Sequence, residues 1–457
     1  MTSTRAAERS GMRTFFIIWG GQVVSVLGTG LTQFGVFFFV FGETGSVTSL
    51  AMVILAASIP SIIIGPFAGT IVDRIDRRWA MIGSDTVAGL SSILLAILWL
   101  TGNLEVWHIV ATAAVSSVGQ AFQEPAYMAT IPLIVPKEQL NRANGLVNTT
   151  QALGTVVAPV LAGVLIVTIG LGGILIIDVV TFAIAVLALL IVRFPRPERS
   201  NASDPDATPS LLSETGDGFR YLKARTGLLI FLFVALVLNF LLGFTNVLTF
   251  PLILSFANET VMGTMLSSVG LAMLAGSIFA STWKGPQHRV RFILGMIVLG
   301  GIFVGLSGAR ANAFWIAGWF IAFMVLVPVV NATSQSLWQV KIAPHYQGRV
   351  FALRRMIAVG ATPIAYALAG PLADNVFEPL MAPGGALADS VGSLIGVGPG
   401  RGIGLMYMIM GALLAITGVA GYMIPKLRNV ERDIPDAIPD TTDDEPELIS
   451  PDISPDR

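Results

Sequence analysis

Cysteine is absent from the 457 residues of this sequence, which excludes disulfide frameworks and sites that bind a metal through thiolates. Histidine is almost absent as well. The three histidines, His108, His288 and His345, fall in predicted polar connections or, for His108, at the very start of an apolar run. A histidine-based metal site inside the apolar part of the chain is therefore excluded, and we expect neither a metal nor any other cofactor.

Charged residues are also scarce. They form 12% of the chain, about half of their share in soluble domains, whereas hydrophobic residues form 54%. This composition predicts a membrane protein whose helices cross the bilayer with roughly 20 residues each. The sequence has no concentrated basic stripe for nucleic acid and no Walker-type loop for nucleotide, so we expect no nucleic-acid partner and no direct use of ATP.

The apolar runs divide into two sets of six. They cover 14–41, 48–72, 79–101, 106–128, 142–168 and 172–193, and then 228–254, 262–284, 291–309, 312–337, 349–374 and 403–425. We therefore predict an all-α membrane protein with twelve transmembrane helices in two six-helix bundles, at 14–193 and 228–425. Residues 1–13 precede the first bundle and a polar linker, 194–227, joins the two. The acidic tail, 426–457, is too poor in apolar residues to fold and should be disordered.

The positive charges give this map an orientation. With twelve spans, one side of the membrane receives 25 of the 27 lysines and arginines, and the other side receives only Arg310 and Arg401. Loops rich in lysine and arginine stay in the cytoplasm. We therefore place both termini in the cytoplasm of a cell whose plasma or inner membrane holds the protein, and we expect a monomer in the lipid bilayer.

A short turn between the second and third runs combines a glycine, a carboxylate and three arginines. Gly69, Asp73, Arg74, Arg77 and Arg78 follow the spacing G-x-x-x-D-R-x-x-R-R. A plain basic anchor on the cytoplasmic side is the alternative interpretation. The spacing resembles the signature of the major facilitator superfamily in the loop between its second and third helices. The resemblance covers about residues 12–425, and it implies a transporter whose two bundles rock around a central site.

A second motif lies in the fifth run, where small residues recur around a proline: Gly154, Ala158, Pro159, Ala162 and Gly163. Small residues at this spacing let two helices pack closely, and proline kinks the helix. The motif resembles the antiporter signature of the superfamily, with alanine at two positions where the signature has glycine. It implies efflux rather than uptake. An ordinary packing face with a kink is the alternative.

Three softer matches resemble the macrolide, drug and siderophore exporter branch of the superfamily. They are Asp85, the stretch 122–132 that contains Glu124, and the stretch 348–350. The arginine that many antiporters of the superfamily carry in the fourth helix is absent here, because 117–121 contains no basic residue.

Carboxylates inside membrane spans are costly and are therefore functional candidates. Asp85 and Asp178 are our candidates for carrying a proton across the membrane, and a structural hydrogen-bonding role for each stays open. Glu124 is expected to pair with Arg77 or Arg74. With the rest of the first motif it would form a cytoplasmic latch that holds the outward-open state. Asp374 is expected to lie in the interface at the outer end of the eleventh span.

Polar residues within the spans are candidates for lining a substrate cavity, and apolar, aromatic walls with few polar anchors suit bulky amphipathic ligands. These candidates are Gln22, Gln33, Gln120, Asn239, Asn246 and Gln335.

The sequence thus predicts a secondary exporter of small amphipathic molecules, such as a drug, a macrolide-like compound or a siderophore, in exchange for protons. Proton-coupled uptake of a small solute is the first alternative, and a non-transporting scaffold or sensor is a remote one. We expect no enzyme, because catalytic histidines or clustered carboxylates at one membrane face are lacking.

Overall fold

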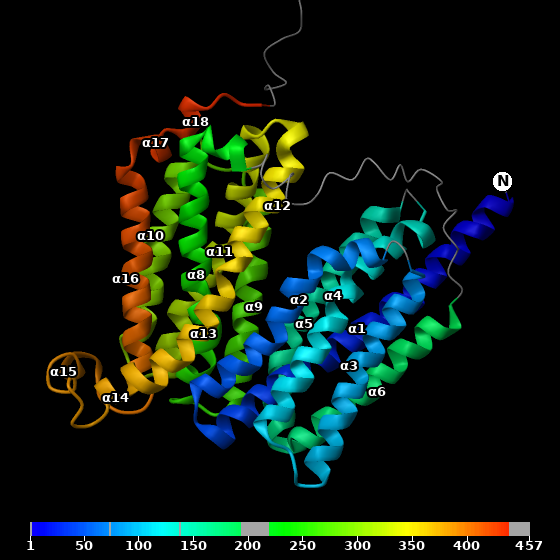
Figure 1. Cartoon of the computed structure of the whole chain (residues 1–457), viewed down its shortest axis with the longest axis horizontal. Helices are drawn as coiled ribbons and strands as arrows, with labels where there is room; N and C mark the ends of the chain where they lie inside the picture. Colours follow the sequence, from blue (N-terminus) through cyan, green and yellow to red (C-terminus); the bar gives the residue numbers. More distant parts are fainter. Residues whose placement is uncertain (1, 73–74, 137–138, 193–218, 438–457) are drawn as a thin grey trace, which may run out of the picture.

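The computed structural model describes residues 2–72, 75–136, 139–192 and 219–437. Its described elements are helical throughout, and they form two bundles (Figure 1). The first bundle contains α1 (Thr2–Thr44), α2 (Val47–Val72), α3 (Arg77–Leu100), α4 (Val106–Ile134), α5 (Leu140–Thr168) and α6 (Gly170–Ile191). Each of these helices contains or overlaps one predicted run, because a bilayer favours continuous apolar helices with internally paired backbone groups.

The second bundle follows the same plan with more interruptions. It contains α8 (Thr226–Leu254), α9 (Glu259–Thr282), α10 (Arg289–Gly308), α11 (Ala313–Lys341), α12 (Pro344–Gly360), α13 (Thr362–Leu372), the π-helix η2 (Ala373–Phe377), α14 (Glu378–Met381), α15 (Gly392–Ile395) and α16 (Arg401–Met423). The eleventh predicted span is therefore divided between α12, α13 and η2. The break falls at Ala361, two residues before Pro363, which has no N–H to donate to the preceding turn.

Eleven helices in the described part of the chain are long and apolar enough to cross a membrane. The remaining helix of the twelve predicted is α4, which packs against α2 and α3 but carries many polar side chains. Glycines set the closest helix contacts in the second bundle. A Cβ added to Gly308 would overlap the Gly404 carbonyl oxygen, so α10 and α16 meet backbone to backbone.

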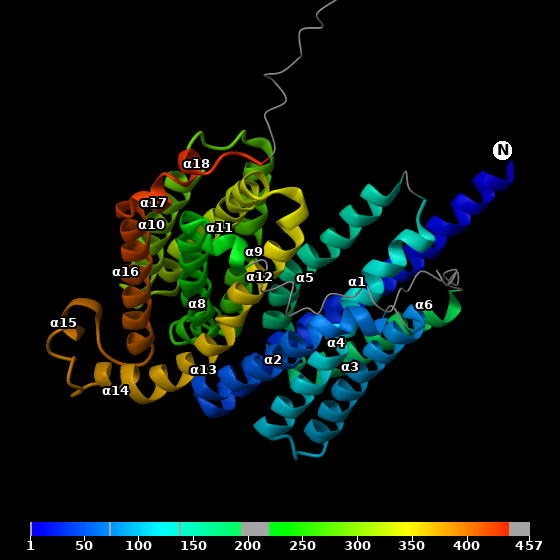
Figure 2. The same cartoon turned by 45° about the horizontal axis from the view of Figure 1, so that its top comes forward.

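Among the described residues, the two bundles make their main contacts toward one face of the molecule. We call the face where α1 begins and α18 (Val430–Asp433) lies the terminal face, and the opposite one the far face (Figures 1 and 2). The most extensive contacts between bundles, α5 with α9 and α2 with α13, run toward the far face, where Phe250 of α8 also packs on Phe37 and Phe38 of α1. The helices of the two bundles diverge toward the terminal face in both views.

The start of the acidic tail is ordered, contrary to our expectation of disorder from residue 426. Residues 425–437 include α17 (Pro425–Arg428) and α18, which dock on the terminal face of the second bundle. The buried Lys341 ammonium donates to the carbonyl oxygens of Glu431 (2.7 Å) and Ile434 (2.5 Å), and it pairs with Asp436 (2.6 Å). The prediction failed because a buried lysine and the free N–H groups at the start of α10, which Glu431 caps, provide partners that composition does not reveal.

Candidate functional site

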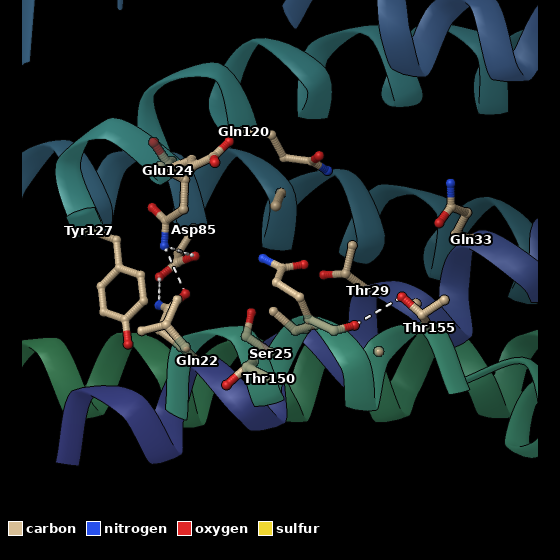
Figure 3. Close-up of a pocket in the computed structure, with 18 of the residues that line it drawn as sticks. Gln22, Ser25, Thr29, Gln33, Asp85, Gln120, Glu124, Tyr127, Thr150 and Thr155 are labelled. Atoms are coloured by element: carbon tan, nitrogen blue, oxygen red, sulfur yellow. Dashed lines mark hydrogen bonds between the residues drawn. The ribbon is translucent and has the colours of Figure 1, made fainter. Parts of the chain in front are cut away.

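The first bundle encloses a cavity of about 700 Å³ between α1, α3, α4 and α5. Among the described residues, its wall carries amide, hydroxyl and carboxylate groups and no lysine or arginine. Figure 3 shows three of the predicted cavity residues, Gln22, Gln33 and Gln120, around this space together with Asp85 and Glu124. Three of the six predicted cavity residues thus line one cavity, and their contact with substrate stays a prediction.

Asp85 lies at the centre of a small network of side chains. It is buried in the third turn of α3, a helix whose start is capped by Asp76. Its carboxylate accepts hydrogen bonds from Gln22 Nε2 (3.4 Å) and Gln123 Nε2 (3.0 Å), and Gln123 Nε2 also donates to Gln22 Oε1 (3.3 Å). In Figure 3 the Asp85 and Gln22 side chains point toward one another from α3 and α1. Both of these hydrogen-bond partners are neutral amides. The carboxylate can therefore gain or lose a proton while the two amides stay in place, and no ion pair to either of them has to break.

Sequence reasoning missed Gln123, although a signal for it existed. Gln123 lies three residues after Gln120, and residues at this spacing share one face of a helix. Two polar atoms at the cavity, Gln123 Oε1 and Tyr127 Oη, are buried and have no hydrogen-bond partner in the described part of the chain. Buried polar atoms are rarely left unpaired in folded proteins, so these two are available to a substrate or to water.

A second cavity, of about 250 Å³, continues the first one toward α2 and α6. The two share Thr29, Gln33 and Gln120 in their walls, so the polar lining extends from Asp85 to Asp178. Asp178 is buried and accepts hydrogen bonds from Ser92 Oγ (2.6 Å) and Thr32 Oγ1 (2.9 Å). The structure thus connects the two proton-carrier candidates through one bundle.

A glycine of α1 leaves the space that Asp178 occupies. A Cβ added to Gly28 would overlap Thr181 Oγ1 and would lie 2.8 Å from Asp178 Oδ1. Both approaches are closer than van der Waals contact, so a larger residue would displace the carboxylate or its neighbours.

The turn after α2 ties three helices of the first bundle together. Arg77 Nη1 donates to the Ala129 carbonyl oxygen of α4 (2.9 Å), and Arg78 donates to the carbonyl oxygens of Leu189 (3.0 Å) and Leu190 (2.6 Å) near the end of α6. Cations stabilise helix C-termini in this way. Asp73 and Arg74 lie outside the described residues.

Gly69 makes no close contact with a neighbouring helix in this conformation, because an added Cβ would meet no atom of the described residues within 4 Å. Glu124 lines the cavity, and its pairing with Arg77 or Arg74 stays a prediction.

The small residues of the fifth helix lie between the two bundles. Ala158 and Ala162 are fully buried, and a Cβ added to Gly163 would lie 2.6 Å from the Glu259 carbonyl oxygen of α9. The contact is mutual, since a Cβ on Gly263 would overlap the Pro159 carbonyl oxygen. Gly154 packs against a side chain of α1, with its added Cβ 2.9 Å from Val26 Cγ1. The motif therefore brings the backbone of α5 directly against that of α9 and leaves room for a side chain of α1.

The candidates from the second bundle lie outside these two cavities. Asn239 donates to the Ala235 carbonyl oxygen of its own helix (2.8 Å), and Asn246 donates to Tyr366 Oη (3.5 Å). Their contact with substrate stays a prediction.

Gln335 is hydrogen-bonded to Arg354, a residue that was not among the predicted site residues. Its Oε1 accepts a hydrogen bond from Arg354 Nη1 of α12 (2.8 Å), and Arg354 Nη2 donates to Ser334 Oγ (3.3 Å). The guanidinium carbon also lies 5.4 Å from the ring centre of Trp338. The signal was visible, because residue 354 falls inside the predicted run 349–374, where a cation is costly. Arg354 entered the sequence analysis only as one of the 25 basic residues on the cytoplasmic side.

Comparison with known proteins agrees with this architecture. The family model described as Major Facilitator Superfamily matches residues 18–366. Macrolide efflux protein A of Streptococcus pyogenes is 33% identical over 372 residues, which cover 79% of this chain and 90% of that protein. Multidrug efflux pump Tap of Mycolicibacterium fortuitum is 25% identical over 356 residues, covering 76% of this chain and 86% of that protein.

Solved structures share the fold at low sequence identity. The nucleoside transporter NupG superposes with a TM-score of 0.64 at 14% identity, and the match covers 90% of this chain and 99% of NupG. A bacterial homologue of the iron transporter ferroportin, in an inward-facing state, gives 0.63 at 16% identity and covers 90% and 98%. The polytopic helical chain described here belongs to the major facilitator superfamily.

Proposed function

We propose that the protein is a secondary active exporter of amphipathic organic molecules, macrolide-like compounds and other drugs among them, and that it works by alternating access in exchange for protons. The observation that carries the proposal is the acidic cavity of the first bundle, where Asp85 and Glu124 line a wall to which the described part of the chain contributes no lysine or arginine. The relatives named for macrolide and multidrug efflux support the direction of transport. Siderophores remain substrates to be tested beside drugs.

The charge of this cavity favours substrates that carry a basic group. A carboxylate in surroundings of low dielectric constant attracts a cation more strongly than it does in water. The cavity volume of about 700 Å³ lies within the range of sites for small organic ligands. Competition between a cationic substrate and a proton for the same carboxylates would couple the two fluxes.

The orientation follows from the distribution of charge. The terminal face carries the basic connections, so we place it in the cytoplasm of a cell membrane and the far face outside. With the bundles joined at the far face, the conformation is inward-open, ready to take substrate from the cytoplasm. The signature turn between α2 and α3 would then latch the cytoplasmic face in the opposite state. We ascribe no catalytic reaction to the protein, and we propose that it works as a monomer.

Inside-out membrane vesicles test the proposal directly. With an imposed pH gradient and membrane potential, vesicles that contain the protein should accumulate a macrolide or a cationic dye, and vesicles from cells without it should not. One proton crossing 100 mV supplies roughly 2.3 kcal/mol, enough for roughly a 50-fold concentration ratio. Accumulation by right-side-out vesicles instead would favour the uptake alternative. The absence of any substrate-specific flux across a panel of drugs, dyes and siderophores would contradict transport.

A further inference from the structure

A carboxylate of the second bundle caps a helix of the first one. Asp374, in η2, accepts hydrogen bonds from three groups at the start of α2: Ser46 Oγ (2.7 Å), Val47 N (3.1 Å) and Thr48 N (2.8 Å). The two partners are more than 320 positions apart in the sequence. Asp374, which the sequence predicts at the membrane interface, thus joins two bundles that must move relative to each other.

The start of α2 needs such an acceptor. The first N–H groups of a helix have no partner within it, and together they form the positive end of the helix dipole. Ser46 satisfies one locally, because its Oγ accepts from Ser49 N (3.2 Å). Asp374 satisfies two others from across the boundary. Gly45, at φ +59°, makes the tight turn between α1 and α2 that brings these groups to the edge of the bundle.

The surrounding geometry holds Asp374 at this position. A Cβ added to Gly370 of α13 would lie 2.5 Å from Thr48 Cα, so the backbones of α13 and α2 touch one turn away from the carboxylate. Asp374 itself lies in a π-helical turn, a rare conformation that is common at functional positions and that changes the direction of side chains along a helix. The hydrogen bonds therefore lie on the boundary at which the bundles separate when the far face opens.

We propose that Asp374 is the outer lock of the transport cycle, a positioning residue that holds the far face closed in the inward-open state and is released when that face opens. Breaking the lock leaves a carboxylate and two N–H groups to be hydrated, so the hydrogen bonds bias the equilibrium toward the inward-open conformation. Under the proposed orientation, α2 would be held at its outer end by Asp374 in one state and at its cytoplasmic end by the Gly69–Arg78 turn in the other.

Electron-paramagnetic-resonance distance measurements on the purified full-length protein test the lock. The chain has no cysteine, so spin labels attach only where a cysteine is introduced. Asn103→Cys and Ala311→Cys place labels on exposed far-face loops, one in each bundle. Asp374→Asn keeps the size of the side chain but removes its charge. We expect it to raise the ratio of far-face-open to far-face-closed molecules about tenfold, equivalent to about 1.4 kcal/mol.

Two further variants separate the lock from a general effect of charge or size. Asp389→Asn removes an exposed carboxylate from the same face and should leave the distance distribution unchanged. Asp374→Glu keeps the charge and should restore most of the closed population. An unchanged distribution in Asp374→Asn, or an equal shift in the Asp389 variant, would overturn the proposal. A loss of both populations together with a lower melting temperature would also overturn it, since Asp374 would then serve folding alone. The measurement uses no substrate, so it stands even if the direction of transport is wrong.

Discussion

Replacing Asp85 by asparagine tests whether the carboxylate in the larger cavity carries the proton. The substitution preserves the size of the side chain but removes its charge and one of its two acceptor atoms. Both carboxylate oxygens are engaged, Oδ2 by Gln22 Nε2 and Oδ1 by Gln123 Nε2. An asparagine side chain has one oxygen for these two donors, and its NH₂ group would face the other one.

The structure allows the cost to folding and the cost to transport to be compared. Losing one of two hydrogen bonds costs about 1 kcal/mol, and the free Gln123 Oε1 offers the asparagine NH₂ a new acceptor. The fold should therefore survive with little loss of stability. The loss to transport is larger, because a carrier that cannot bind the proton forfeits the roughly 2.3 kcal/mol that each proton supplies at 100 mV. Accumulation should fall from roughly 50-fold to none.

The assay separates coupling from substrate binding. Inside-out vesicles with an imposed pH gradient report accumulation of a labelled macrolide, and the same vesicles without a gradient report exchange of labelled for unlabelled substrate. We expect Asp85→Asn to abolish accumulation and to retain exchange. Asp389→Asn, which removes an exposed carboxylate from the far face, is the matched control and should retain both.

Three results would refute the reasoning or redirect it. If Asp85→Asn vesicles still accumulate substrate under a pH gradient, Asp85 is not the carrier. If Asp178→Asn alone loses accumulation and keeps exchange, the proton is carried in the smaller cavity. If the double variant retains accumulation driven by the pH gradient, neither carboxylate is the carrier and the proton assignment is wrong.

The remaining predictions concern packing and docking. Gly28→Ala should lower the free energy of unfolding by about 1–3 kcal/mol, since its methyl group would overlap the environment of Asp178, and melting of the detergent-solubilised protein measures this. Lys341→Met should release residues 425–437 from the terminal face and speed their cleavage in limited proteolysis, whereas Lys284→Met, at an exposed position, should not. If α5 and α9 slide on each other during the cycle, Gly163→Leu should abolish transport. The amount of folded protein in the membrane should stay unchanged. An unaltered transport rate would show that their contact is not needed.

The fold was predictable from the sequence because each helix that crosses a bilayer needs a continuous apolar segment, and such segments can be recognised and counted. Apolar runs located most of the helix ends to within a few residues, for example 48–72 against Val47–Val72 and 142–168 against Leu140–Thr168, although α1 begins at Thr2 rather than at 14. The break at Ala361 was less evident, since a proline inside an apolar run marks a kink or an end with equal ease. The docking of α18 depends on Lys341, which is buried in the structure. In the sequence this lysine looks like an ordinary basic residue of a cytoplasmic loop, so its role was not predicted.

The site was only partly predictable, for a different reason. Gln22, Asp85 and Asp178 were found because a polar group inside a span is costly wherever it points. Their partners were not found, because pairs such as Gln22 with Asp85 are 63 positions apart and are brought together only by the packing of α1 on its neighbours. Asp374 shows the same limit most clearly: its position was expected, but the helix that it caps belongs to the other bundle.

The polar character of α4 has a consequence for how the chain enters the membrane. This helix is not among those that are apolar enough to span a bilayer by themselves, because the residues that line the cavity replace apolar ones. Glu124, Gln120 and Gln123 would oppose the insertion of α4 as an isolated helix, because ionisable and polar side chains are costly inside a bilayer. The connection between α3 and α4 is short, from Thr101 to Glu105, so the two can enter as a hairpin. In such a hairpin, α3 would supply the hydrophobicity that α4 lacks because its polar residues line the cavity.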